Sequence, residues 1–197
     1  AVLPGYRADL AIFDRVDRDG RVTQVYRRGL LVAEDGLCTL PKHAKEDSAS
    51  LRSSIDTHWL EPRDFLIPAP DGSGAGPPPN IHVMHVLQDR IDTGRSIEAA
   101  CLRDRHFVAD PRRDLAKIVV IERHRASGEM GRGFVRGFQL QTGAIASSVA
   151  HDAHNLIVVG TNDQDMLAAV VRIIQLHGGF VAVRDGRVLA EVPLPIA

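Results

Sequence analysis

Leu156-Ile-Val-Val-Gly-Thr-Asn-Asp-Gln-Asp-Met-Leu-Ala-Ala-Val-Val-Arg-Ile-Ile-Gln-Leu-His-Gly-Gly179 carries the clearest structural signals in the chain. Its first four residues are a short apolar run of the kind found in buried strands. The apolar residues that follow recur at three- and four-residue spacing and so form one stripe along a helix, namely Met166, Leu167, Val170, Val171 and Ile174. The stretch therefore predicts a strand followed by a helix from about Asn162 to Leu176 that covers a sheet.

The ends of this helix carry their own signals. Thr161 is expected to be the N-cap, with Gln164 as its capping-box partner three residues later. Asp163 and Asp165 fall in the first turn, where the helix dipole favours negative charge. Gly178 and Gly179 are expected to end the helix.

The flanking sequence predicts a strand-rich domain around this helix. Strands are expected at residues 81–87, 116–121, 133–138 and 144–149, with Glu122, Arg123 and His124 ending the second and a glycine-rich turn at 128–133. Residues 180–183 and 188–192 flank Asp185-Gly186, which predicts a hairpin with a type I′ turn.

The first part of the chain has a different pattern. Short apolar runs at residues 8–13, 22–26 and 30–33 alternate with Asp-Gly turns. We expect three regions, which are a small β-sandwich segment over 1–40, a linker or surface helix over 41–57, and a domain over 58–197. Within the last region, the Pro- and Gly-rich residues 68–79 predict a mobile loop. The fold class is α+β.

Composition excludes several classes of protein. The 197 residues carry 24 basic and 25 acidic side chains, a net charge of −1, which gives no footprint for nucleic acid or for an anionic membrane. No apolar run approaches the roughly 20 residues that cross a bilayer. Cys38 and Cys101 lie far apart, which favours a reducing cytoplasm. The chain begins without Met, and we expect that an upstream segment has been removed.

Two histidine arrangements are candidates for chemistry. His82 and His85 lie in an expected strand, where their odd spacing places the two rings on opposite faces and argues against a shared metal. The sequence His151-Asp152-Ala-His154-Asn155 is the stronger candidate. Three interpretations remain open for it: support of a metal or catalytic centre, contact with a substrate or lid through hydrogen-bonding side chains, and a polar corner that satisfies turn backbone.

Other signatures of catalysis are missing from the sequence. It contains no His-x-His pair, no His-Glu-x-x-His helix and no Cys-x-x-Cys pair. It also lacks the alternating strand–helix units of a (β/α)8 barrel. No catalytic residue and no metal ligand is therefore assigned to this chain.

Residues 115–124, 131–138, 143–163 and 189–196 together resemble the C-terminal domain of bacterial adenine deaminases. Residues 3–12 and 29–36 resemble strands that follow the barrel in the amidohydrolase superfamily. The resemblance covers nearly the whole chain, although no family motif is evident at 68–79.

The resemblance implies a parent hydrolase that converts adenine and water to hypoxanthine and ammonia in a (β/α)8 barrel. It implies a binuclear iron or manganese centre, which supplies hydroxide by lowering the pKa of bound water. That centre is expected to lie outside this chain, which would support or close the barrel mouth and be inactive alone. Expected partners are the missing N-terminal segment and further copies of the chain. The alternative is a stand-alone, non-catalytic ligand-binding or interaction module.

Overall fold

A computed structural model describes residues 2–41, 55–73, 76–150 and 153–195 of the chain. The chain divides into two compact units, Ala1–Asp47 and Ser48–Ala197. The expected linker or helix at 41–57 lies largely outside the described residues.

The first unit is one antiparallel sheet in the order β1-β2-β3-β4. Its strands are β1 (Leu10–Phe13), β2 (Val22–Arg27), β3 (Leu30–Glu34) and β4 (Leu37–Cys38). The β2–β3 and β3–β4 hairpins are tight because the residues at their tips accept positive φ, as at Asp35-Gly36 (47° and 81°), whereas residues 14–21 form a longer connection between β1 and β2. The expected strands are confirmed, whereas their membership of a sandwich stays a prediction.

The second unit is built on an eight-stranded sheet in the order β15-β14-β12-β13-β10-β11-β6-β7. All neighbouring strands are antiparallel except β11 and β6. The strands are β6 (Asn80–Val86), β7 (Thr93–Ala99), β10 (Ala116–Ile121), β11 (Met130–Arg136), β12 (Ala144–Ser147), β13 (Leu156–Gly160), β14 (Gly179–Arg184) and β15 (Arg187–Pro193).

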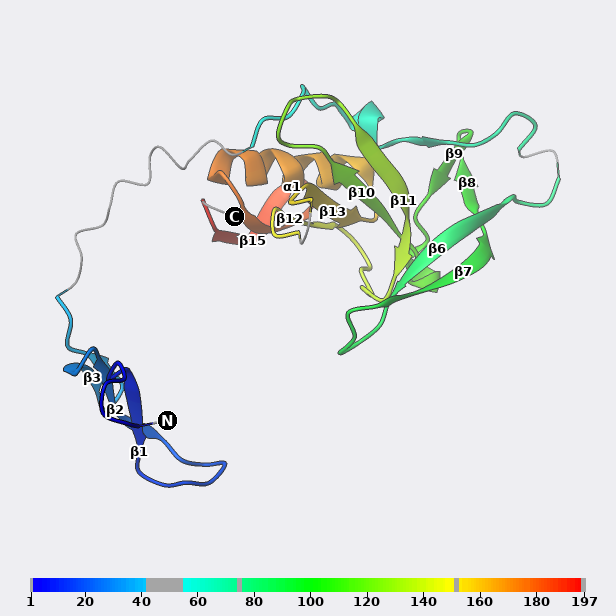
Figure 1. Cartoon of the computed structure of the whole chain (residues 1–197). Helices are drawn as coiled ribbons and strands as arrows, with labels where there is room; N and C mark the ends of the chain where they lie inside the picture. The colour runs from blue at the N-terminus through cyan, green and yellow to red at the C-terminus, as the bar shows by residue number, and fades with distance from the viewer. Residues whose placement is uncertain (1, 42–54, 74–75, 151–152, 196–197) are drawn as a thin grey trace. The chain divides into compact units, whose positions relative to one another are not determined.

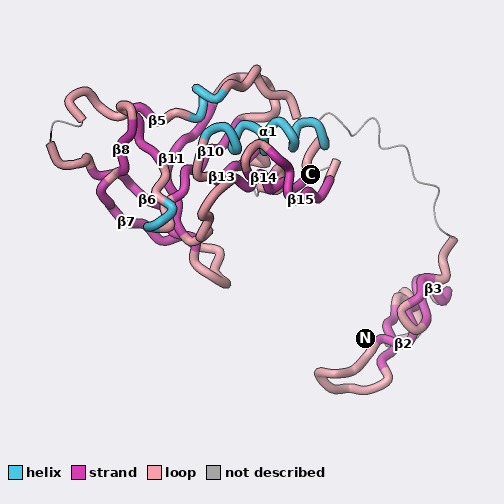
Figure 2. Tube along the Cα trace, turned by 180° about the vertical axis from the view of Figure 1, so that it is seen from behind, coloured by secondary structure: helices cyan, strands magenta, loops and turns pink. Residues whose placement is uncertain are grey.

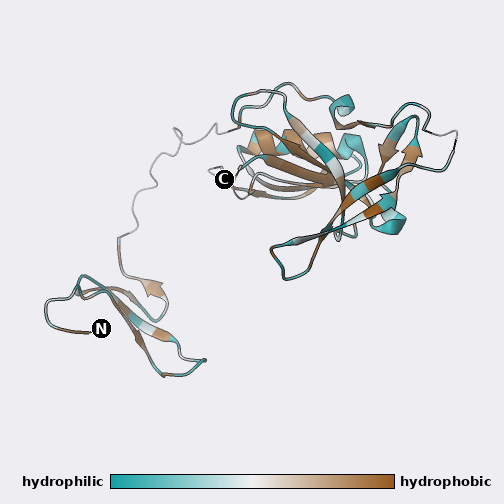
Figure 3. Ribbon diagram, turned by 45° about the vertical axis from the view of Figure 1, so that its right-hand side comes forward, coloured by the Kyte–Doolittle hydropathy of each residue, from teal (hydrophilic) through white to brown (hydrophobic). Residues whose placement is uncertain are grey.

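A helix covers one end of one face of this sheet. The helix α1 (Asp163–Leu176) packs on β12, β13 and β14, as Figures 1 and 2 show from opposite sides. Its buried Met166, Val170 and Ile173 join the sheet residues in one apolar core. Figure 3 shows the strands beneath the helix to be apolar along much of their length. The helix is amphipathic, but the predicted stripe is wrong for Val171, which is exposed, and it missed Ala169 and Ile173, which are buried. The α+β class is confirmed.

A three-stranded sheet, β5-β9-β8, packs on the same face of the eight-stranded sheet as α1 and forms a second apolar core there. Its strands are β5 (Ile67–Pro68), β8 (Cys101–Arg103) and β9 (His106–Val108), and short 3-10 helices lie at Pro62–Phe65 and Pro111–Arg113. Buried Phe107 in β9, Phe134 in β11 and Val83 in β6 bring the two sheets together. The eight-stranded sheet is thus covered by α1 at one end and by these strands at the other.

The N-terminal cap of α1 differs from the prediction by one residue. Asn162, and not Thr161, is the N-cap, and its side-chain oxygen accepts a hydrogen bond from the backbone N–H of Asp165 at 2.8 Å. The Asn162 amide donates to the Asp165 carboxylate at 2.7 Å. The Thr161 hydroxyl instead donates to the carbonyl of Gly143. The helix ends at His177, whose φ of 59° closes the last turn.

Other expectations were partly wrong. The glycine-rich turn at 128–133 is wrong for Gly131, which lies inside β11 because its backbone pairs with Val120. The strand expected from Gly133 exists but begins earlier, at Met130. Strand β7 was missed because its exposed and half-buried residues alternate with few large apolar side chains. In the Pro- and Gly-rich segment, Pro68 pairs with His106 in a short strand, residues 74–75 lie outside the described part, and the rest has no helix or strand.

Two expectations based on periodicity are confirmed. Asp185 and Gly186 both have positive φ, 52° and 72°, as a type I′ hairpin requires. His82 and His85 point to opposite faces of β6, since Ile81 and Val83 are buried and His85 lies on their side of the strand. None of the helices in the described residues is long and apolar enough to span a bilayer.

Asp165 connects the helix start to the β14–β15 turn. Besides Asn162, it accepts hydrogen bonds from the backbone N–H groups of Asp185 at 3.2 Å and Gly186 at 2.7 Å. Desolvation acts to raise the pKa of Asp165, but these three donors outweigh it and lower the pKa. One buried carboxylate therefore holds two separate elements together.

We predict that Asp165→Ala lowers the free energy of unfolding by about 2 kcal/mol, because it leaves buried donors without an acceptor. Asp185→Asn is the matched control, since that side chain is 88% exposed and Asn tolerates its positive φ. Urea unfolding followed by circular dichroism measures both. Equal losses in the two variants would contradict the role given to Asp165.

Candidate functional site

The predicted polar cluster is only partly described. His151 and Asp152 lie outside the described residues. His154 is exposed and has a φ of 50°, and Asn155 is half-buried immediately before β13. The left-handed backbone at His154 turns the chain into the strand.

Strand pairing brings a second segment to the same place. Ile121 at the end of β10 pairs with Leu156 at the start of β13, and with Met130 at the start of β11. Glu122, directly after β10, and Asn155, directly before β13, therefore lie at the same edge of the sheet. Around them lies an open pocket of about 500 Å³ lined by Val120, Glu122, Glu129, Met130, Gly131 and Asn155.

Glu122 organises the loop that follows β10. Its carboxylate accepts hydrogen bonds from the backbone N–H groups of His124, Arg125 and Ser127 and from the Ser127 hydroxyl. Desolvation acts to raise the pKa of Glu122, but these hydrogen bonds outweigh it and lower the pKa to about 2. Glu122 is therefore ionised at neutral pH and fixed as an acceptor, which suits a positioning residue better than a general acid.

His124 connects this loop to the predicted cluster. Its Nε2 lies 3.0 Å from the carbonyl oxygen of Ala153, and because a carbonyl accepts, Nε2 carries the proton. The contact spans 29 residues of sequence and sets the 122–127 loop against the 153–155 segment. The two polar segments that the sequence marked separately thus form one site.

This site can recognise a polar ligand. The Asn155 side chain makes no hydrogen bond with another described residue, so its amide donor and carbonyl acceptor are both available. Within the described ranges no group of three His, Cys, Asp or Glu side chains is placed to hold a metal ion. The binuclear metal centre implied by the resemblance therefore does not fit the described residues.

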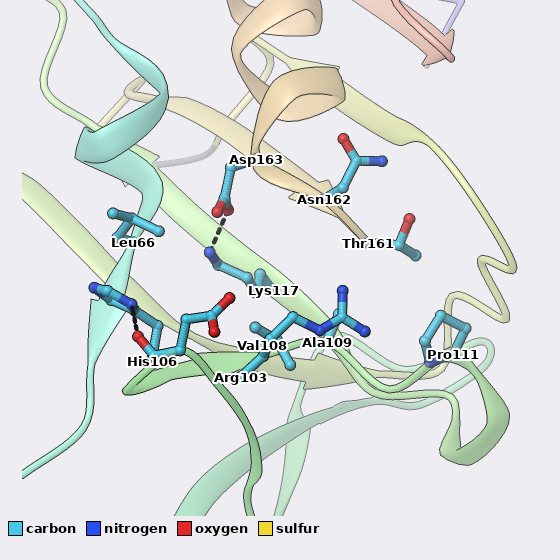
Figure 4. A pocket seen from close by; sticks show the side chains of 11 residues that line it. Leu66, Arg103, His106, Val108, Ala109, Pro111, Lys117, Thr161, Asn162 and Asp163 are labelled. Atoms are coloured by element: carbon cyan, nitrogen blue, oxygen red, sulfur yellow. Dashed lines mark hydrogen bonds and ion pairs between the residues drawn. The ribbon is translucent and has the colours of Figure 1, made fainter.

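A second pocket, of about 380 Å³, lies on the helix side of the sheet. Figure 4 shows Lys117 reaching from β10 to Asp163 in the first turn of α1, beside Leu66 and Val108. Lys117 is buried, and its ion pair with Asp163 compensates that burial. Because the charge of Lys117 is already paired and Asn162 is committed to the helix cap, we interpret this pocket as structural.

Sequence reasoning identified Glu122 and His124 only as the end of a strand. The signal that could have united them with Asn155 is the antiparallel order of β10 and β13, which places the end of one beside the start of the other. That order is a long-range property, and spacing along the chain does not reveal it.

The Glu122 loop is predicted to be sensitive to acid. A carboxylate whose folded pKa lies below its ordinary value contributes stability that is fully present above about pH 4.5 and lost as the pH falls towards 2. Amide signals of His124, Arg125 and Ser127 should therefore hold their positions through pH 4.5 and shift only as the pH approaches 2, where Glu122 takes up a proton in the folded protein. NMR titration measures this, and Glu122→Gln should show a loosened loop already at pH 7. A Glu122 carboxyl that titrated near 4.5 would contradict the assignment.

Comparison with known proteins places these features in a family. Residues 90–197 match the family described as the adenine deaminase C-terminal domain. Adenine deaminases from Geobacillus kaustophilus, Clostridium botulinum strain Langeland and Desulfatibacillum aliphaticivorans are 39%, 40% and 41% identical to the chain. Each alignment covers 100% of this chain but 33%, 32% and 33% of the relative, in the same order.

The chain thus spans about a third of the length of the curated relatives that it matches. The family match includes every strand from β7 to β15 and the whole of α1. The candidate site at Glu122, His124 and Asn155 lies inside the matched residues. This chain belongs to the adenine deaminase C-terminal domain family.

Proposed function

We propose that this chain is the C-terminal part of an adenine deaminase, which converts adenine and water to hypoxanthine and ammonia, and that it supports or closes an active site built by upstream residues. The observation that carries the proposal is the extent of the match. The whole chain aligns with adenine deaminases that are about three times as long. The remaining two thirds of such a protein supply the barrel and its metal ligands.

The described residues support a role beside the catalytic centre. Deamination of an aromatic amine needs an activated water, and the described part of the chain brings no set of metal ligands together. It does offer Asn155 with a free amide and His154 with an exposed ring. An Asn amide can donate to one adenine nitrogen and accept from the exocyclic amine at the same time. Asn155 is therefore the residue we assign to substrate or lid contact, with His154 beside it.

His151 and Asp152 belong to the same proposal on sequence grounds. They directly precede Ala153, His154 and Asn155 in the sequence, and they lie outside the described residues. Residues 1–40 would complete a β-sandwich with strands upstream of the barrel. Unpaired strand edges favour association with the missing segment or with further copies. Cytoplasmic location and an iron or manganese centre complete the proposal.

Activity is the first test. Ammonia release from adenine should be undetectable for the 197-residue chain alone and should appear when the upstream segment is restored, both measured with added manganese or iron. Tight adenine binding by the isolated chain, without turnover in the longer protein, would favour the stand-alone binding module instead.

The candidate residues provide the second test. Asn155→Ala and His154→Ala in the longer protein should lower kcat/KM for adenine about tenfold, the loss expected when one or two hydrogen bonds are removed. His177→Ala is the matched control, because His177 is also exposed and has a φ of 59° against 50° for His154. If His154→Ala and Asn155→Ala behave like His177→Ala, the cluster is structural.

A further inference from the structure

The eight-stranded sheet has a second face, and strand register shows which residues form it. Directly paired residues share a face, so Ile145 in β12 lies beside Ala182 in β14 and Val159 in β13. The opposite face is the one under α1, since Glu191 of β15 reaches Arg172 of the helix at 2.7 Å. Glu191 pairs with Val181, so Val181 also points to the α1 side. Ile145 pairs with Ala182, the next residue of β14, and therefore points to the opposite side.

This second face is apolar. Phe180, Val192 and Met84 are 41%, 54% and 43% exposed, and Ile145 is 38% exposed. Ile157, Val120 and Ile118 lie between them in the register, half-buried. Contiguous exposed apolar surface on a sheet is characteristic of a site that another polypeptide covers.

Part of the face is already covered from within the chain. Leu140 packs on Val159, Val135 and Ala116 and buries that end of the sheet. No described helix or strand layer lies over the rest, from Ile118 and Val120 to Phe180. The core residues of α1 and of the three-stranded sheet all lie on the other side.

Two glycines leave the middle of this face without side chains. Gly131 and Gly133 of β11 pair with Val120 and Ile118. A Cβ atom added at either position would meet its nearest neighbour at 3.9 Å and 3.8 Å, which is ordinary van der Waals contact. Neither glycine has a positive φ. Nothing within the described chain requires glycine here, whereas the close approach of a second backbone would.

The candidate site lies on the same face. Val120 and Gly131 line both the apolar surface and the pocket that contains Glu122 and Asn155. Asn155 is two residues before Ile157, so strand alternation places both on this side. A body that contacts Asn155 must therefore lie over the uncovered face of the sheet.

We infer that this face is the docking surface for the upstream two thirds of the polypeptide found in the longer relatives. The inference rests on the proposed function and specifies where the partner binds. An upstream segment in the same chain is present at high effective concentration and outcompetes a separate copy for the surface. The apolar area supplies the contact, and the Glu122–Asn155 pocket then opens into the junction.

Thiol labelling tests the inference. In a background with Cys38→Ser and Cys101→Ser, a single cysteine is placed at Ile145→Cys on the uncovered face or at Val171→Cys on the outer side of α1. The two positions are equally exposed, at 38% each, so their maleimide labelling rates should be similar in the 197-residue chain. With the upstream segment restored, labelling at position 145 should slow about tenfold or more, because reaction then requires opening of the interface, whereas labelling at 171 stays within about twofold.

Three results would overturn the inference: unchanged labelling at 145 in the longer protein, protection of 171 instead of 145, or protection of 145 in the short chain that increases with its concentration. The last would assign the face to a second copy. Val192→Cys repeats the measurement at a second position on the face. Protection at 145 together with unaltered kinetics of Asn155→Ala would support the docking surface and refute the site, so the two proposals fail separately.

Discussion

An eight-stranded sheet has two faces to bury, and the described residues contain a single α-helix to do so. The helix and the three-stranded sheet cover one face, and the apolar stripe of α1, anchored by Asn162 and Asp165, fits that side. The other face keeps Ile145, Phe180 and Met84 partly exposed. This imbalance between sheet area and covering elements accounts for the exposed apolar surface and for the side on which the candidate site opens.

The candidate site depends on the same sheet. The antiparallel pairing of β10 with β13 puts Glu122 beside Asn155, and the hydrogen bonds to Glu122 hold the next five residues in a compact loop. His124 then reaches the carbonyl of Ala153. A rigid sheet and a carboxylate that stays ionised thus fix a short polar segment which, in an isolated peptide, would have no preferred shape.

Local patterns predicted what depends on nearby residues. The helix, the β14–β15 hairpin and the opposite orientations of His82 and His85 follow from periodicity and turn chemistry over a few residues. Strand β7 could not be predicted in this way, because its residues are mostly polar and its place in the sheet is set by pairing with β6. Gly131 suggested a turn because glycine usually marks one, yet its place in β11 is set by pairing with β10. The union of Glu122, His124 and Asn155 is likewise a property of strand order, which the sequence alone does not specify.

The polar groups on the two sides of the sheet differ in a way that separates support from recognition. On the covered side, Lys117 is paired with Asp163, and Asp165 is saturated by three donors, as burial demands. On the open side, the Asn155 amide makes no hydrogen bond with the described residues. Water can form hydrogen bonds with it there, so the amide carries little desolvation penalty. If another part of the polypeptide covered that face, it would exclude the water. The Asn155 amide would then need a different group with which to form hydrogen bonds. A polar ligand held at the junction satisfies this requirement, so the docking surface and the recognition site are two consequences of one uncovered face.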